Sequence, residues 1–243
     1  MIAQVAAAFA FLTRLPVARH TVFDAKDVGH AMRWFPLVGA LLGGIYIAAL
    51  WVLARMFPPL VVSVIIVAIE AAITGGMHLD GVADTADGFG GGRTREDVLR
   101  IMRDHAIGAY GAIALILVIG LKITTIAALI DTRRASYALL LAPILGRWSA
   151  VLLSATESYA RPAGSPSGFV GRAELIIATV FAVMAAFTLD PWRGIPGFVL
   201  VAGGSAWWGW RCRRRIGGVT GDTLGAAIEI AECLVLLTYA SRG

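Results

Sequence analysis

Three aspartates lie close together in a chain that is otherwise poor in charge. Asp80, Asp84 and Asp87 stand at positions i, i+4 and i+7 of the segment TGGMHLDGVADTADGFGGG, residues 74–92. On an α-helix these positions fall within about 60° of one another, so the three carboxylates share one face. Such crowding destabilises a helix unless a cation neutralises it, and hard divalent cations prefer oxygen ligands. The spacing therefore predicts a Mg²⁺ site, with Mn²⁺ as the alternative metal.

A solvated acidic face is the other interpretation of these aspartates. The segment interleaves them with Gly, Ala and Val, whereas a solvated helix would carry Lys and Glu there. This composition favours the metal site. Calcium fits less well, because the segment lacks the pattern of an EF-hand loop.

Two residues just before the aspartates are further candidates. Glu70 lies in the preceding apolar run and is a candidate metal ligand. His78 falls on the opposite face of the predicted helix. One interpretation of His78 is a structural hydrogen bond, and the other is contact with a substrate phosphate.

The segment after the aspartates, RTREDVLRIMRDHAIGAYG, suits a phosphate. Thr94 and Asp97 form a capping box, which predicts a short helix. Arg93 and Arg103 carry guanidinium groups suited to phosphate oxygens, although Arg93 is also explained by membrane orientation alone. Asp104 follows at the entrance to the next apolar run, where we expect it to contact metal or substrate.

Five ionisable residues fall inside apolar runs, where charge is costly and indicates function. They are Glu70, Lys122, Arg147, Glu229 and Glu232. One interpretation is pairing inside a helical bundle, as Glu70–Lys122 or Glu229–Arg147. The other is contact of Lys122 and Glu229 with a substrate. For Glu232 we prefer pairing.

The last apolar run begins with a glycine-rich helix start, GGVTGDTLGAAIEIAE. Asp222 stands at this start, seven residues before Glu229, so the two share a helical face. Gly218 and Gly221 make the start flexible and leave backbone N–H groups able to bind an anion. Asp222 is therefore a further candidate catalytic residue, and the two glycines are candidates for substrate binding.

The composition indicates an integral membrane protein. Of the 243 residues, 58% are hydrophobic and 15% are charged, and the mean hydropathy is +0.77; a soluble domain would carry about a quarter charged residues. We expect an all-α, polytopic helical bundle of six to seven transmembrane helices, forming a single domain over residues 1–243. The run 196–211, rich in Gly and Trp, is the weakest candidate span. The candidate spans are 34–56, 59–76, 106–130, 135–155, 173–190, 196–211 and 223–240.

The basic residues predict the orientation of these spans. With a cytoplasmic N-terminus, fourteen Lys and Arg residues fall inside and five outside, in line with the positive-inside rule. Segments 74–105, 157–168 and 211–223 then share the cytoplasmic side and can meet in one site, with 74–105 as the catalytic segment. Basic charge placed between apolar runs favours lipid head groups or an anionic substrate over nucleic acid. Residues 1–20 are expected to form a short interfacial helix and not a cleaved signal peptide.

Together these features predict phosphoryl-group transfer. Divalent metal ions and arginines stabilise the charge of a diphosphate, and a carboxylate can accept the proton of an attacking hydroxyl. A phospholipid-type CDP-alcohol phosphotransferase and a cation-coupled transporter are the alternatives. A transporter would place its carboxylates near the bilayer midplane, whereas the charge distribution places the aspartates at the cytoplasmic edge.

The sequence resembles the cobalamin synthase family, the adenosylcobinamide-GDP ribazoletransferases. The HxDGxxDxxDG core is specific to this family, and the similar blocks keep the family's order and spacing over nearly the whole chain. These blocks are FLTRLPV (11–17), WFPLVGALLGG (34–44), TGGMHLDGVADTADGFGGG (74–92), RIMRDHAIGAYGAIAL (100–115) and GVTGDTLGAAIEIAE (218–232).

The resemblance implies the last step in assembly of the cobalamin nucleotide loop. Such enzymes join adenosylcobinamide-GDP to α-ribazole or its 5′-phosphate, giving adenosylcobalamin or its phosphate and GMP. It also implies Mg²⁺ dependence and a multi-pass location in the cytoplasmic (inner) membrane, in contact with lipid, with the active site facing the cytoplasm. A homo-oligomer, or association with other cobalamin-assembly enzymes, is left open.

Carried onto these residues, the resemblance implies a metal site at the aspartates. Asp80, Asp84 and Asp87 would hold one or two divalent ions on the diphosphate. Asp104 or Asp222 would complete the metal shell. One unassigned carboxylate would accept the proton of the ribose hydroxyl.

The arginines complete the implied site. Arg103 and Arg93 would hold phosphate oxygens. The DxxDG of residues 84–88 is also similar to the start of the CDP-alcohol phosphotransferase motif, so a similar active site is expected. The chain departs from that motif directly afterwards, because Phe-Gly-Gly-Gly-Arg at 89–93 stands where an Ala-Arg pair belongs.

Overall fold

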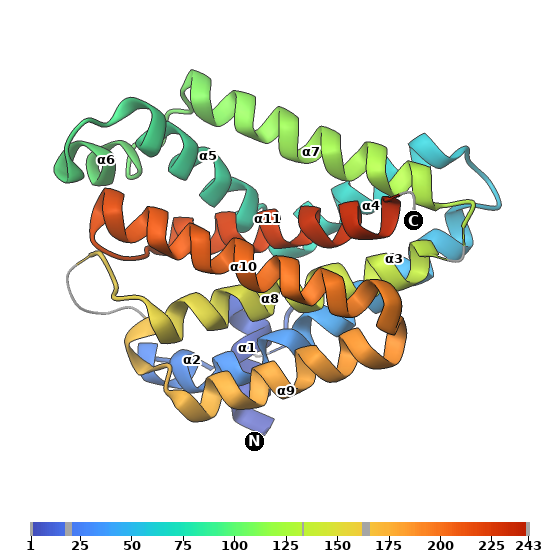
Figure 1. Cartoon of the computed structure of the whole chain (residues 1–243), viewed down its shortest axis with the longest axis horizontal. Coiled ribbons are helices and arrows are strands. Elements are labelled where there is room, and N and C mark those ends of the chain that lie inside the picture. The colour runs from blue at the N-terminus through green and yellow to red at the C-terminus, as the bar shows by residue number, and fades with distance from the viewer. Residues whose placement is uncertain (1, 18–20, 133, 162–165, 242–243) are drawn as a thin grey trace.

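The computed structural model describes residues 2–17, 21–132, 134–161 and 166–241. Within these ranges the chain is helical, apart from one parallel β-bridge between Tyr159 and Val219 (Figure 1). The helices are α1 (Ile2–Leu12), α2 (Ala25–Ala31), η1 (Met32–Trp34), α3 (Phe35–Leu53), α4 (Pro59–Thr74), α5 (Met77–Gly91), α6 (Arg95–Ile101), α7 (Ala109–Leu129), α8 (Arg134–Thr156), η2 (Pro166–Phe169), α9 (Arg172–Leu189), α10 (Pro191–Ile216) and α11 (Gly221–Ala240).

The centre of the bundle is formed by α8 and α11. Over the most apolar 18-residue stretch of each helix, 83% of α8 and 67% of α11 are buried, against 22% of α7 and of α9. α3 packs closely on α8 through Gly39 and Gly43: a Cβ atom at Gly39 would lie 2.2 Å from the carbonyl oxygen of Pro143. Small residues four positions apart allow this close approach between membrane helices.

Five helical segments of the described chain are long and apolar enough to cross a membrane, and the bent pair α4–α5 makes a sixth if it counts as one span. This confirms the polytopic all-α bundle. The lower end of the predicted six to seven helices is reached when α4–α5 counts as one span, and five segments fall one below it. Residues 196–211 do not qualify. They belong to α10, a 26-residue helix beside α9 and α11 whose hydropathy is lowered by glycines, tryptophans and a basic last turn. The five segments are 25–53, 109–129, 134–156, 172–189 and 221–240.

α4 and α5 meet at an angle of 90°. Gly75 and Gly76, which separate them, have left-handed backbone with φ of 67° and 73°, a conformation that glycine adopts without the steric cost of a side chain. The predicted span 59–76 therefore ends at this break. α5 then leads to the end of the bundle where α6 lies (Figure 1).

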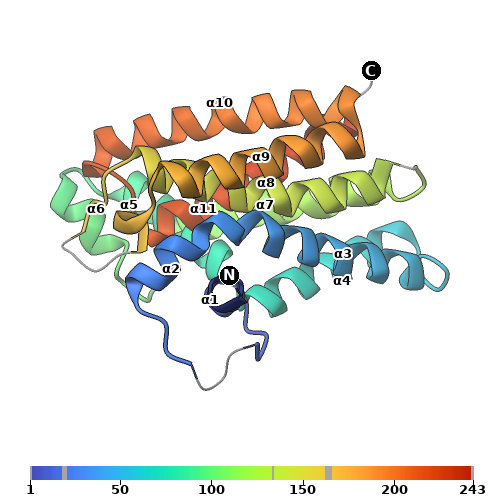
Figure 2. The same cartoon turned by 90° about the horizontal axis from the view of Figure 1, so that it is seen from below.

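Segments far apart in sequence converge at that end, on the left of Figure 1. α5 and α6 lie there with the start of α7 and the end of α10, as both views show (Figures 1 and 2). Arg95 of α6 donates hydrogen bonds to the carbonyls of Ile216 (2.8 Å) and Ala160 (2.9 Å). The predicted meeting of segments 74–105, 157–168 and 211–223 is confirmed. Arg19, Arg133 and Arg242 of the charge count, and loop residues 162–165, lie outside the described residues.

Candidate active site

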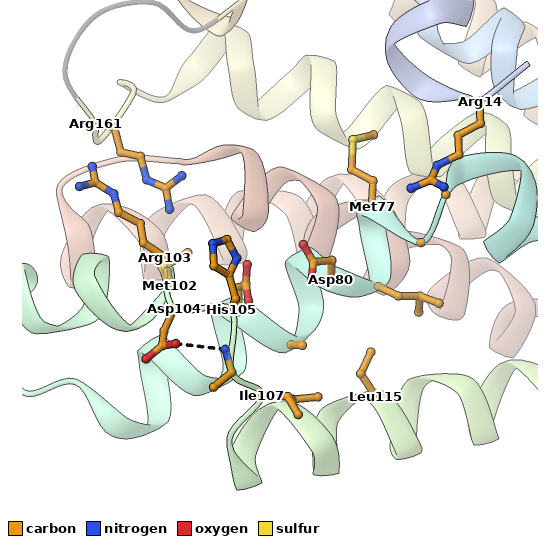
Figure 3. Close-up of a pocket in the computed structure, with 16 residues that line it drawn as sticks. Arg14, Met77, Asp80, Met102, Arg103, Asp104, His105, Ile107, Leu115 and Arg161 are labelled. Carbon is orange, nitrogen blue, oxygen red and sulfur yellow. Dashed lines mark hydrogen bonds between the residues drawn. The ribbon is translucent and has the colours of Figure 1, made fainter. Parts of the chain in front are cut away.

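A cavity of about 840 Å³ opens at this end of the bundle (Figure 3). Asp80 lies between Arg14 on one side and Arg103 and Arg161 on the other (Figure 3). Carboxylates and guanidinium groups from distant parts of the chain thus share one cavity. This combination suits a diphosphate together with a divalent cation. The charged or titratable residues that line it are Arg14, Asp80, Asp84, Arg103, Asp104, His105 and Arg161.

Two of the three clustered aspartates line the cavity. α5 forms where the sequence predicts a helix, and Asp80 and Asp84 lie one turn apart on its cavity side. Asp84 is surrounded by the like charges of Asp80, Asp222 and Asp87, with Arg161 as an opposing charge. Carboxylates this close repel one another unless a cation is present. Their oxygens are the donor type that Mg²⁺ prefers, so the residues present fit that metal.

Asp87 faces α7 instead of lining the cavity. Its carboxylate accepts hydrogen bonds from the backbone N–H of Gly108 (2.7 Å) and of Gly111 (2.8 Å). A helix N-terminus leaves such N–H groups unpaired, and a negative charge there is stabilising. A Cβ atom at Gly111 would lie 2.4 Å from the carboxylate, so glycine is required at this contact. Asp87 therefore attaches the start of α7 to α5.

Of the two further candidates for the metal shell, Asp104 lines the cavity and Asp222 lies beside it, in the lining of a second cavity. Asp222, in the first turn of α11, pairs with Arg161 at an Nη2–Oδ2 distance of 2.7 Å. Because Arg161 also lines the cavity, this pair connects the start of α11 to the site. Asp104 is exposed in the cavity wall and accepts a hydrogen bond from the backbone N–H of Ala106 (3.1 Å; Figure 3).

Arg14, His105 and Arg161 line the cavity although sequence reasoning did not assign them to it. From the sequence, Arg14 and Arg161 entered only the count of basic residues that predicts the orientation of the membrane spans. The structure brings Arg14 to the α4–α5 break: its backbone N–H donates to the carbonyl of Ile73 (2.7 Å). A Cβ atom at Gly75 would lie 2.0 Å from its side-chain Nε. The only local signal was that Arg14 belongs to one of the blocks that resemble the family.

The wall that carries Arg103 and Asp104 follows α6. Thr94 caps this helix, and its backbone N–H and hydroxyl donate to the Asp97 carboxylate at 3.4 and 3.0 Å. These hydrogen bonds from Thr94 lower the pKa of Asp97. The predicted capping box is confirmed. It fixes the beginning of the short helix that leads into the cavity wall.

The charged residues of the apolar runs form a separate, buried cluster. Lys122 Nζ donates to Glu70 (2.8 Å), Glu229 (2.7 Å) and Glu232 (2.5 Å), and Arg147 pairs with Glu232. The structure thus does not bring Glu70 to the three aspartates. It does not bring Lys122 and Glu229 to the cavity that Asp80 and Asp84 line. Buried charges need partners, so pairing inside the bundle is the arrangement adopted. Glu229 pairs with Lys122 and not with Arg147.

The remaining predicted contacts also lie apart from Asp84. His78 is buried on the other side of α5, with Nδ1 3.5 Å from an Arg147 guanidinium nitrogen. Arg93 is exposed and does not line the cavity. Gly218 packs on the loop after α8, where a Cβ atom would lie 2.0 Å from a carbonyl oxygen. Gly221 lines a second cavity together with His78.

The fold and the cavity define a polytopic helical membrane protein with a site suited to phosphate and a divalent cation at one end. Residues 4–240 match the family model described as Cobalamin-5-phosphate synthase. The chain therefore belongs to the cobalamin-5-phosphate synthase family, which confirms the resemblance seen in the sequence blocks. It is an enzyme, a transferase of cobalamin biosynthesis.

Its similarity to individual members of the family extends over nearly the full length. It is 38% identical over 236 residues to the adenosylcobinamide-GDP ribazoletransferase of Syntrophobacter fumaroxidans, covering 94% of each chain. The protein of that name from Klebsiella pneumoniae is 38% identical over 244 residues, with 98% of this chain and 99% of the relative covered. The Chlorobaculum tepidum protein is 37% identical over 249 residues, covering 99% and 96%. No solved structure matches the chain.

Proposed function

We propose that this enzyme joins adenosylcobinamide-GDP to α-ribazole or its 5′-phosphate and releases GMP. The name of its relatives, adenosylcobinamide-GDP ribazoletransferase, supplies the activated substrate and the ribazole. The observation that carries the proposal in this chain is the cavity where Asp80 and Asp84 face three arginines. Carboxylates that can hold a divalent cation, together with guanidinium groups, form a site that binds the negatively charged oxygens of a diphosphate.

The reaction is a displacement at phosphorus. A ribose hydroxyl oxygen of the nucleoside attacks the phosphorus atom that bears the cobinamide, and the bond from that phosphorus to the GMP oxygen breaks. Arg14, Arg103 and Arg161 hold the diphosphate oxygens and stabilise the charge that develops on GMP. A cavity carboxylate accepts the proton that the hydroxyl loses. Asp87 contributes by holding the start of α7 against α5.

Asp80 and Asp84 would hold Mg²⁺ or Mn²⁺, with Asp104 or Asp222 completing the shell. When bound there, such an ion would neutralise the charge of the diphosphate and activate the phosphoryl group as a Lewis acid. Asp222 is kept near the site by its ion pair with Arg161. The crowding of Asp84 by three other carboxylates supports this assignment.

We further propose that the cavity faces the cytoplasm from the inner membrane. Basic residues gather at the cavity end, where Arg14, Arg95, Arg103 and Arg161 lie. The last turn of α10 adds three more arginines at that end. Membrane proteins retain such basic segments on the cytoplasmic side, which supports this orientation.

The test is an assay on the detergent-purified protein with Mg²⁺, adenosylcobinamide-GDP and either nucleoside. We expect GMP release that EDTA abolishes and that added Mg²⁺ restores. Release of CMP from a CDP-lipid, with no GMP release, would assign the chain to CDP-alcohol phosphotransfer. Cation flux in sealed vesicles without any condensation product would instead indicate a transporter.

A further inference from the structure

A second cavity of about 550 Å³ adjoins the first. Met77, Asp80, Arg103 and Arg161 line both cavities, so these side chains form the boundary between them. We call the second cavity the apolar chamber. Any molecule in the apolar chamber would lie next to the carboxylates and arginines of the candidate active site.

The walls of the apolar chamber are mostly hydrocarbon. They come from α1, η1, α3, α5, α8, η2 and α11 and from the segments that carry Arg103, Tyr159 and Arg161. Asp80, Arg103, Arg161 and Asp222 form the charged part of the lining. The volume is in the range of small-molecule sites, and the lining suits a flat, largely apolar group. The main apolar lining residues are Phe11, Leu12, Met32, Phe35, Leu224 and Ile228.

Three side-chain polar atoms of the chamber wall are buried without a hydrogen-bond partner among the described residues. They are Ser154 Oγ, His78 Nε2 and, at the boundary with the charged cavity, Arg161 Nε. Ser154 is 5% exposed and His78 is 2% exposed. A buried polar atom without a partner costs about 1–3 kcal/mol, so a ligand atom that pairs with it is favoured. Ser154 Oγ and His78 Nε2 belong to residues that line the apolar chamber alone, so they mark where a ligand of the chamber carries its polar groups.

We propose that the apolar chamber binds the base of the ribazole acceptor; this inference rests on the proposed function. The base is a dimethylbenzimidazole, which is flat, mostly hydrocarbon, and carries one ring nitrogen that can accept a hydrogen bond. The Ser154 hydroxyl donates to that nitrogen. The attached ribose then lies at the boundary formed by Asp80, Arg103 and Arg161.

The guanine of the activated substrate suits the apolar chamber less well. Guanine has several donors and acceptors along its edges, and those that face the apolar part of the wall, formed by Phe11, Met32, Phe35 and Ile228, would lose their partners. The corrin ring is too bulky for a cavity of this volume. The activated substrate therefore occupies the larger, charged cavity, and the two substrates meet at the boundary residues.

Ser154→Ala tests the assignment, because it removes one hydroxyl and little volume. We expect KM for α-ribazole to rise about fivefold, because the variant loses one hydrogen bond to the base. KM for adenosylcobinamide-GDP should stay unchanged. The matched control is Ser149→Ala on the same helix. Ser149 is also buried, but its hydroxyl donates to the Gly146 carbonyl (2.7 Å) and does not line the chamber. It should change neither KM.

Binding without turnover provides an independent measurement. Titration calorimetry of the wild-type protein with α-ribazole should show binding that Leu224→Trp, which fills the chamber, weakens at least tenfold. Removing both methyl groups from the base should weaken binding about tenfold, as expected for two buried methyl groups. Binding of adenosylcobinamide-GDP to Leu224→Trp should be unchanged, which also shows that the variant folds.

The outcomes separate the inference from the proposed function. Absence of GMP release by the wild-type protein would overturn the proposed function, while α-ribazole binding still tests the chamber. Unchanged α-ribazole binding in both Ser154→Ala and Leu224→Trp would overturn the inference, as would a raised KM for adenosylcobinamide-GDP alone. Displacement of α-ribazole by phospholipid, with no dependence on the base, would assign the chamber to lipid and also overturn it.

Discussion

Asp84 has the most crowded acidic position in the cavity, beside Asp80, Asp222 and Asp87. Asp84→Asn keeps the size of the side chain and removes its charge. We expect kcat/KM to fall by about 10²–10³-fold, the scale of losing one preorganised electrostatic contact in an active site. The Mg²⁺ concentration needed for half-maximal rate should rise. Thermal unfolding should stay within a few degrees of wild type, because the substitution removes repulsion.

GMP release over a Mg²⁺ series measures both effects on Asp84→Asn. Gln4 in α1 lies outside the lining of either cavity, and Gln4→Ala provides a surface control. Wild-type activity with the wild-type Mg²⁺ dependence in Asp84→Asn would show that Asp84 is not a metal ligand.

Replacing Asp87 should destabilise the protein, whereas replacing Asp84 should not. Asp87→Asn loses a charge that accepts two backbone N–H groups at the start of α7. Hydrogen bonds to a charged group contribute about 1.5–3 kcal/mol, so the free energy of unfolding should fall by that order. Activity should fall as well, because α7 follows the cavity wall directly. A wild-type unfolding midpoint in detergent would contradict the anchoring role.

At the scale of elements, the break between α4 and α5 determines where the acidic helix lies. Both glycines at the break have positive φ, so alanine at either position is strained by about 1 kcal/mol. Their surroundings differ. A Cβ atom at Gly75 would press on Arg14 Nε, whereas a Cβ atom at Gly76 would contact no other group and would lie beside the open cavity that both glycines line.

Comparing Gly75→Ala with Gly76→Ala therefore separates two effects: the backbone strain of alanine at positive φ, which both variants share, and the displacement of Arg14, which only Gly75→Ala causes. Both variants should lose similar stability in thermal unfolding. Both glycines line the cavity, but only Gly75→Ala also moves a cavity arginine, so it should raise KM for adenosylcobinamide-GDP several-fold more than Gly76→Ala does. Equal KM values in the two variants would mean that Arg14 does not hold the diphosphate.

Local pattern predicted several elements correctly. The acidic helix follows from the spacing of its aspartates, and the cap of α6 follows from Thr94 and Asp97. Periodicity alone did not show that Asp87 faces another helix, because its partners, Gly108 and Gly111, are set by tertiary packing. Nor did the paired glycines at 75–76 reveal a right-angled break, since small residues also occur inside membrane helices.

At the scale of the whole molecule, the buried cluster joins four helices through Lys122, with carboxylates from α4 and α11 and an arginine from α8. Lys122→Met leaves three buried carboxylates without their common partner. Breaking a buried ion pair costs about 3–5 kcal/mol, and we expect a loss of at least this order in the free energy of unfolding. Equilibrium unfolding in mixed detergent micelles measures it.

Arg134→Met, at the exposed start of α8, is the control for Lys122→Met and should have little effect. Replacing Glu70 by Gln in the Lys122→Met background should recover part of the lost stability, because one unpaired charge is removed. Equal stability of Lys122→Met and wild type would show that the cluster does not hold the bundle together.

The global arrangement was predictable where charge and hydropathy control it. The uneven distribution of basic residues placed three distant segments on one side, and they do meet there. The sequence left open whether Glu229 and Lys122 pair or contact a substrate. Hydropathy locates a charge within an apolar run but not the direction it faces, so the choice depends on how the helices rotate against each other.

The cluster also has a consequence for how the protein is made. Glu70, Lys122 and Arg147 are translated long before Glu229 and Glu232, which lie on the last helix. Until α11 leaves the ribosome and inserts, Arg147 lacks its carboxylate and Lys122 has one carboxylate instead of three. Charge without partners is costly in the bilayer. The buried cluster is therefore complete only after α11 has been translated and inserted, and a chain that ends before α11 keeps Arg147 and Lys122 in the bundle without the carboxylates of Glu229 and Glu232.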